Sequence, residues 1–220
     1  MIKYIVSLIF IFLSVCIVIL GIMNYNSRYS DTPDKEPFSF LNQFPYELQD
    51  NPTMKYNFLF RIIAALLGGS YICFGCYLFW FKDMYGLKNI HDYILGVLMT
   101  VNGIAIFSEF VITLKAYRKH LMFTSLLFSL TVMIYAYLGF YVLIDARKLH
   151  PQILAYIVLI LAAALLASLI FTPLKRWMYL EKEEEDGRIT YHRKRLSILP
   201  FMEWIFLASN VLLIILLTIF

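Results

Sequence analysis

Six long apolar segments constrain this chain more than any other feature of its sequence. They are Ile2–Met23, Phe58–Phe81, Ile90–Leu114, Leu121–Leu143, Gln152–Leu174 and Ile198–Phe220. A helix needs about 20 apolar residues to cross the hydrocarbon of a bilayer, and every segment reaches that length. Lipid offers the backbone no hydrogen-bond partners, so helices are expected. The alternating ten-residue strands of a barrel do not occur in the sequence. The prediction is an all-α polytopic membrane protein, a bundle of six transmembrane helices.

The composition and the connections indicate one domain. The 220 residues are 61% apolar and 15% charged, which excludes an ordinary soluble globular protein. Short connections predict a single six-helix transmembrane domain over residues 1–220. The longest connection, residues 24–57, is rich in proline and aromatic side chains. Aromatic residues favour the membrane interface, so we expect this loop to cap one side of the bundle.

Ionisable residues near one end of the predicted helices form the main candidate site. The first, third and fifth connections emerge on the same side of the membrane, so Glu109, His120 and Glu203 lie within a turn or two of that side. Carboxylates in a span usually face partners rather than lipid. Together with a histidine they are candidate acid–base catalysts, and an ion-pair network between helices is the alternative. The sequence leaves open whether the protein is an enzyme.

Basic residues on the same side are candidates for binding lipid phosphate. Arg61 lies about one turn inside the second segment, where it either joins the buried carboxylates or extends to the headgroups. Arg193, Lys194 and Arg195 directly precede the last segment. Cationic residues beside an anionic surface contribute about 1 kcal/mol each. A solvated loop face is the alternative for the triplet. The expected ligand is an anionic lipid headgroup, and other membrane proteins are further possible partners.

Other polar residues predict contacts between helices, and no motif indicates a cofactor. Asn102 and Asn210 are expected to hydrogen-bond across helices. Asn102 and Glu109 are seven residues apart and share one helix face, which also permits a small transporter with a polar path. The spacing of His120 and the two glutamates matches no specific metal motif, so neither metal nor cofactor is expected.

The charges of the connections predict an orientation. Connections one, three and five carry thirteen Lys and Arg residues, whereas the N-terminus and the even connections carry five. Because cytoplasmic loops are enriched in Lys and Arg, the odd connections are predicted to be cytoplasmic.

The last segment carries a resemblance to a known family. The sequence from Ser197 to Trp204 contains a Glu followed by an aromatic residue, and Asn210 follows. It resembles the last span of the six-helix family of DRAM autophagy modulators and post-GPI-attachment factor 2. The stretch from Lys55 to Arg61 is similar to the entry of that family's second span, and Tyr29–Pro33 is similar to part of its first lumenal loop. The acidic exit of the third segment fits less well, and His120 matches a His in some members only.

The resemblance implies two roles and an orientation. One role is the remodelling of GPI-anchor lipids, with a GPI or phosphoinositide headgroup as the ligand, and the alternative is a non-catalytic membrane organiser or autophagy modulator of the DRAM type. Either would place the protein in Golgi, ER or lysosomal membranes, and the plasma membrane also remains open. The family topology makes the odd connections lumenal or extracellular, which conflicts with the charge distribution. The lipid and the oligomeric state are not predicted.

Overall fold

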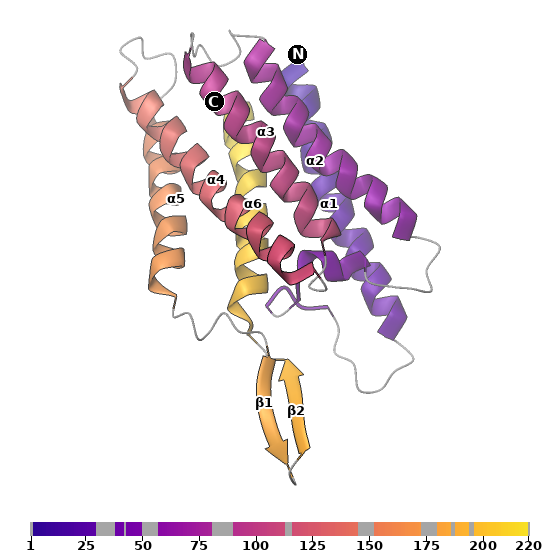
Figure 1. Ribbon diagram of the computed structural model, residues 1–220. Helices are drawn as coiled ribbons and strands as arrows, with labels where there is room; N and C mark the ends of the chain where they lie inside the picture. The colour runs from indigo at the N-terminus through magenta and orange to yellow at the C-terminus, as the bar shows by residue number, and fades with distance from the viewer. Residues whose placement is uncertain are drawn as a thin grey trace.

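The computed structural model confirms an all-α bundle with six helices long and apolar enough to cross a membrane (Figure 1). The structure describes residues 2–29, 38–41, 43–49, 57–80, 90–112, 116–144, 152–172, 180–185, 188–193 and 196–219. The six helices are α1 (Ile2–Tyr29), α2 (Asn57–Trp80), α3 (Ile90–Val111), α4 (Tyr117–Ile144), α5 (Gln152–Phe171) and α6 (Ile198–Ile219). Two of them, α1 and α4, extend several residues beyond the apolar runs of the sequence.

Successive helices run antiparallel, and α6 returns through the bundle. Helix α2 packs on α1 and α3, and α4 packs on α3 and α5. The last helix contacts α1, α4 and α5, and so joins the beginning of the chain to its second half (Figure 1). Both termini lie at one end of the bundle. The first, third and fifth connections lie at the other, which is called the loop end below.

The contact between α2 and α3 is the closest in the bundle because glycines line it. A Cβ atom added at Gly68 would lie 2.9 Å from the carbonyl oxygen of Gly103, and one added at Gly75 would lie 2.8 Å from that of Gly96. The absence of side chains lets the two backbones touch, as at many transmembrane helix pairs. Gly69 takes no part, since a Cβ there would meet nothing within 4 Å.

Part of the first connection packs against the bundle at the loop end. A short 3₁₀ helix, η1 (Pro45–Gln49), contacts α1, α2, α3 and α6. Gly21 of α1 makes room for it, because a Cβ there would lie 2.8 Å from Leu48 Cδ1. Residues 38–41 and 43–49, with η1, are called the cap below. In the rest of the connection predicted as a capping loop, residues 24–29 instead continue α1, and residues 30–37, 42 and 50–56 lie outside the described residues.

The charged fifth connection contains a hairpin that the sequence did not predict. Strands β1 (Leu180–Glu185) and β2 (Arg188–Arg193) pair antiparallel, with Glu181 opposite His192 and Glu183 opposite Thr190. The hairpin projects from the loop end in Figure 1. Glu and Lys, which make up most of β1, are depleted in strands, so the composition of this segment did not indicate the pairing.

Candidate functional site

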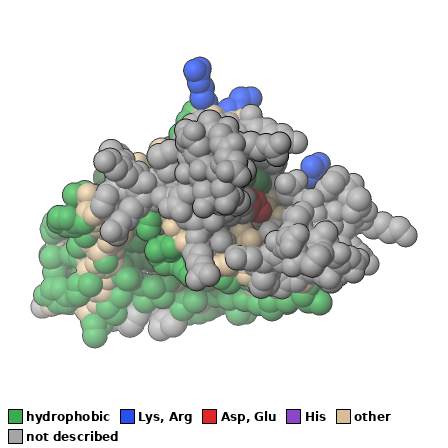
Figure 2. Space-filling model, turned by 90° about the horizontal axis from the view of Figure 1, so that it is seen from below, with side chains coloured by type: hydrophobic (Ala, Val, Ile, Leu, Met, Phe, Trp, Pro, Cys, Tyr) green, Lys and Arg blue, Asp and Glu red, His purple; other side chains and the backbone are tan. Residues whose placement is uncertain are grey.

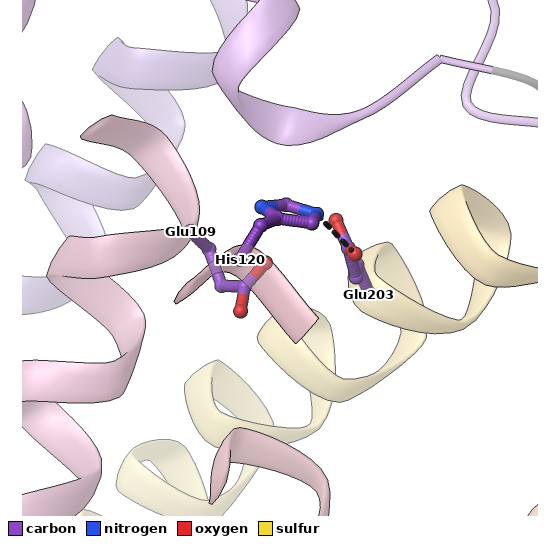
Figure 3. Close-up of side chains that lie close together, drawn as sticks. All are labelled: Glu109, His120 and Glu203. Carbon is purple, nitrogen blue, oxygen red and sulfur yellow. Dashed lines mark hydrogen bonds and ion pairs between the residues drawn. The ribbon is translucent and has the colours of Figure 1, made fainter. Parts of the chain in front are cut away.

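Three helices bring Glu109, His120 and Glu203 together at the loop end (Figure 3). Glu109 lies in the last turn of α3, His120 in the first turn of α4 and Glu203 in the second turn of α6. One potential ligand atom from each residue lies within 4.8 Å of the other two. All three are removed from solvent, with exposed fractions of 0%, 1% and 0%. This set is called the acid–histidine cluster.

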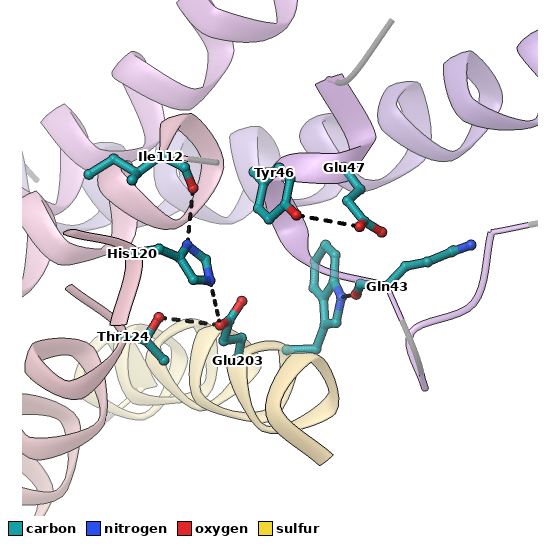
Figure 4. A network of polar contacts seen from close by, with 8 residues as sticks. Gln43, Tyr46, Glu47, Ile112, His120, Thr124 and Glu203 are labelled. Carbon is teal, nitrogen blue, oxygen red and sulfur yellow. Dashed lines mark hydrogen bonds and ion pairs between the residues drawn. The ribbon is translucent and has the colours of Figure 1, made fainter. Parts of the chain in front are cut away.

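The end of α3 fixes the tautomer of His120. Its Nδ1 lies 3.0 Å from the carbonyl oxygen of Ile112. The last carbonyls of a helix lack intrahelical partners, and a carbonyl can only accept, so Nδ1 carries a proton and donates it. The other ring nitrogen, Nε2, lies 3.0 Å from Glu203 Oε1. The hydroxyl of Thr124 donates to the same carboxylate oxygen at 3.2 Å (Figure 4).

Glu109 is the least satisfied member of the cluster. Among the described residues, neither of its carboxylate oxygens has a hydrogen-bond partner, and nor does Glu203 Oε2. Thr124, His120 and Glu203 are its polar neighbours, but none of them meets hydrogen-bond geometry with it. Two ionised carboxylates no more than 4.8 Å apart repel by at least about 3 kcal/mol at an effective dielectric constant of about 20. Buried groups of this kind require a proton or a cation between them.

Aromatic residues of the cap cover His120. The rings of Phe44 and Tyr46 stack on each other and meet the imidazole edge-on, with centroids 5.4 and 5.6 Å from it. Tyr46 also donates a long hydrogen bond of 3.5 Å to Glu47. The indole nitrogen of Trp204 donates to the carbonyl oxygen of Gln43 at 2.8 Å (Figure 4). The cap therefore closes the cluster from the loop end.

A second polar network lies deeper in the bundle around Asn210. Its Oδ1 accepts from Tyr71 and from Asn102, both at 2.7 Å. Its Nδ2 donates to Thr131 Oγ1 at 2.9 Å and to the carbonyl oxygen of Phe206 at 2.8 Å. Asn210 thus uses both ends of its amide to join four helices. This arrangement agrees with the predicted helix-to-helix contacts of Asn102 and Asn210, and Tyr71 is a member that the sequence did not indicate.

The basic residues predicted to bind phosphate lie apart from the buried cluster. Arg61 is exposed, because its neighbours Phe60, Ile63 and Ala64 occupy the buried face of α2. The alternative that it joins the buried carboxylates is therefore wrong, and its extension toward the headgroups stays a prediction. The side chain of Arg193 and all of Lys194 and Arg195 lie outside the described part of the chain.

Exposed cations that the structure describes lie at the loop end. Arg118 and Lys119, which directly precede His120, are exposed, as is Arg61. Blue side chains project from this end of the molecule in Figure 2. The acid–histidine cluster itself is buried, so any contact of these cations with lipid phosphate would occur at the exposed surface of the loop end around Arg61, Arg118 and Lys119, which is called the rim below.

An apolar groove runs from the cap toward the middle of the bundle. It encloses about 550 Å³ between α1 and α6, with walls from α2 and α3. Its lining includes Phe10, Ile106 and Ala208, and its loop end is formed by Phe40, Phe110 and Trp204. Exposed lining residues such as Val15 and Ile19 show that it opens on the outer surface, where a bilayer would lie. Nothing in the sequence pattern signalled this groove.

The groove and the cluster share a wall. Trp204 follows Glu203 and Phe110 follows Glu109, so each carboxylate has a neighbour in the lining. Rings of Phe40 and Phe110 pack edge-on against Trp204, with centroids 4.9 and 6.3 Å away.

No known protein family, no curated protein and no solved structure matches the chain. The function must therefore be argued from this geometry.

Proposed function

We propose that the protein binds a membrane lipid, with one acyl chain in the groove between α1 and α6 and the headgroup at the loop end. The observation that carries the proposal is an apolar groove of about 550 Å³ that ends at Trp204, next to the acid–histidine cluster. Its volume is in the range of ligand sites. Its lining on α6, from Trp204 to Val211, extends about 10 Å at 1.5 Å per residue.

The selectivity of such a site would come from the headgroup. Lipid tails are as apolar as the groove, so moving a chain from the bilayer into it yields little free energy. Arg118 and Lys119 at the rim would attract a phosphate, at about 1 kcal/mol per cation. Arg61 and the Arg193–Arg195 triplet would add to this attraction. An anionic phospholipid, such as one with a phosphoinositol headgroup, is the ligand that this charge favours.

The resemblance of the last helix to the GPI-factor branch gives this proposal a specific form. A GPI anchor joins a phosphoinositol headgroup to lipid chains, so remodelling of its lipid is the process that we propose the protein serves. Glu109, His120 and Glu203 are the candidates for acid–base chemistry. The alternative is a non-catalytic organiser of the DRAM type, in which the same cluster only holds α3, α4 and α6 together.

The small-transporter alternative receives less support. Asn102, Asn210 and Glu109 are fully buried, and the Asn210 network uses its polar groups for contacts between helices. A polar path would need these groups to face a water-filled space. The groove that the structure describes is instead lined almost entirely by apolar side chains.

Filling the groove tests lipid binding. Ala208 lies in the lining and is exposed, so Ala208→Phe would occupy the space of the acyl chain. We expect crosslinking to a phosphatidylinositol with a photoactivatable acyl chain, in phosphatidylcholine nanodiscs, to fall several-fold. Ala164→Phe, on an exposed position of α5, is the matched control and should crosslink like the wild type. Equal crosslinking of wild type and Ala208→Phe would overturn the proposal.

Two further measurements test the headgroup preference and distinguish GPI-lipid remodelling from the non-catalytic organiser. A photoactivatable phosphatidylcholine in the same nanodiscs should crosslink less than the phosphatidylinositol if the rim cations select an anionic headgroup. Mass spectrometry of GPI-anchored proteins from cells lacking the protein should show altered anchor lipids if it serves remodelling. Unaltered anchors, with crosslinking intact, would favour the organiser.

A further inference from the structure

We propose that Glu109, His120 and Glu203 bind a divalent transition-metal ion, with zinc as the ion to test first. The three side chains come from three helices, are buried, and present one ligand atom each within 4.8 Å of the others (Figure 3). Imidazole nitrogen and carboxylate oxygen are ligands that zinc accepts in proteins. The expectation from the sequence was that no metal binds, because residues so far apart in the chain form no recognisable motif.

The hydrogen bonds of His120 leave it in the state of a metal ligand. Its Nδ1–H donates to the Ile112 carbonyl, so in the neutral ring Nε2 presents a lone pair to the cluster. Metal-binding histidines usually donate their second ring nitrogen to a carbonyl or carboxylate in this way. A lone pair on Nε2 would face Glu203 Oε1 at 3.0 Å, where both atoms are acceptors. A shared cation resolves that conflict.

Glu109 provides a second and separate observation. Its carboxylate is completely buried in the cluster, and among the described residues neither oxygen has a partner. Glu203 Oε2 is in the same position. One divalent ion would satisfy these atoms together. It would also neutralise the two carboxylates beside a neutral imidazole, so the buried site would carry no net charge.

The geometry fits an ion with an open position. Tetrahedral ligands about 2.1 Å from zinc are about 3.4 Å apart, so the ligand atoms, which lie within 4.8 Å of one another, have to approach by at most about 1.4 Å. Flexible glutamate side chains can supply that movement. Three protein ligands leave the fourth position of a tetrahedral ion to water or to another oxygen ligand. The competing arrangement has no metal and uses protons alone, one on His120 Nε2 and one on Glu109.

Zinc binding by the purified full-length protein tests the proposal. After treatment with a chelator, titration with Zn²⁺ should show one saturable site per chain. His120→Ala, Glu109→Gln and Glu203→Gln should each weaken binding more than about tenfold, since even residues that only support ligands are worth 10–100-fold. Glu47→Gln is the matched control: Glu47 is a buried carboxyl that belongs to the cap and lies outside the cluster, so this variant should bind zinc like the wild type.

X-ray absorption of the zinc-loaded wild type keeps the test independent of variants that fail to fold. We expect only nitrogen and oxygen ligands, at about 2.0–2.2 Å. The free cysteines Cys16, Cys73 and Cys76 are the other candidate ligands, and replacing all three by serine should leave binding unchanged. No saturable site in the wild type, or sulfur around the ion, would overturn the proposal and leave the proton-only arrangement. Failure here would leave lipid binding in the groove untouched.

Discussion

At the scale of single residues, the bundle concentrates its buried polar groups at two points. The acid–histidine cluster lies at the loop end, and the Asn210 network lies two turns deeper on the same helix. In the first, carboxylate oxygens remain without partners among the described residues. In the second, both ends of the Asn210 amide are used, and one neutral oxygen, Asn102 Oδ1, lacks a partner among the described residues. A largely satisfied network is typical of structural contacts, whereas several unsatisfied carboxylate oxygens in one buried cluster indicate a site that takes up a proton, an ion or a ligand.

Removal of the Asn210 amide should destabilise the bundle. In Asn210→Leu the hydroxyls of Tyr71 and Thr131 and the amide of Asn102 lose their shared partner. We expect a loss of about 1–3 kcal/mol in the free energy of unfolding, because each buried group left unpaired is costly. Unfolding by sodium dodecyl sulfate in mixed micelles would measure it. Ser125→Ala, at an exposed position of α4, is the control, and a loss below about 0.5 kcal/mol in Asn210→Leu would contradict the role.

At the scale of secondary-structure elements, two contacts hold the site in place. The glycine-lined contact of α2 with α3 positions the helix that ends in Glu109. The cap is attached to α6 by the Trp204 indole and by the hydrogen bond from the Ser197 amide to the Leu41 carbonyl, 2.8 Å long. Because the cap covers His120 and its Phe40 ring lines the groove, movement of the cap would affect the cluster and the groove together.

A methyl group at the contact of α2 with α3 should be costly, and the neighbouring glycine provides the comparison. In Gly103→Ala the new Cβ would lie 3.0 Å from the Gly68 carbonyl oxygen and 3.0 Å from the Ile72 nitrogen. Backbone atoms cannot yield as a side chain can, so we expect a loss of about 1–3 kcal/mol in stability. The same micelle titration measures it. Gly69→Ala should be neutral or slightly stabilising, and equal effects of the two substitutions would refute the close contact.

At the scale of the whole molecule, the asymmetry between the two ends is the main feature. The cap, the hairpin and the acid–histidine cluster all lie at the loop end, and both termini lie at the other (Figure 1). Across the sequence, the loop-end connections carry thirteen Lys and Arg residues against five for the opposite side. A lipid bound at the rim would therefore belong to the leaflet that the loop end faces.

The distribution of charge predicts that the loop end faces the cytoplasm. An epitope tag inserted between β1 and β2 is probed with antibody in cells whose plasma membrane is permeabilised and whose organelle membranes are left intact. We expect the antibody to reach the tag under these conditions, since Lys and Arg are retained on the cytoplasmic side. A tag at the C-terminus is the control and should show the opposite accessibility. Protection of the hairpin tag would instead support the lumenal loop end that the resemblance implies.

The sequence by itself determined the six helices, the placement of ionisable residues at one end and the polar positions of α6. Hydropathy and the unmet hydrogen bonds of a backbone in lipid are local properties, so they can be read from a single chain. The partners of Glu203, the exposure of Arg61 and the groove beside Trp204 depend on how each helix is rotated about its axis. That rotation follows from packing between segments distant in sequence, such as the glycine contact of α2 with α3. Only the tertiary structure could decide it, because side chains equally spaced from a helix end can face lipid or one another.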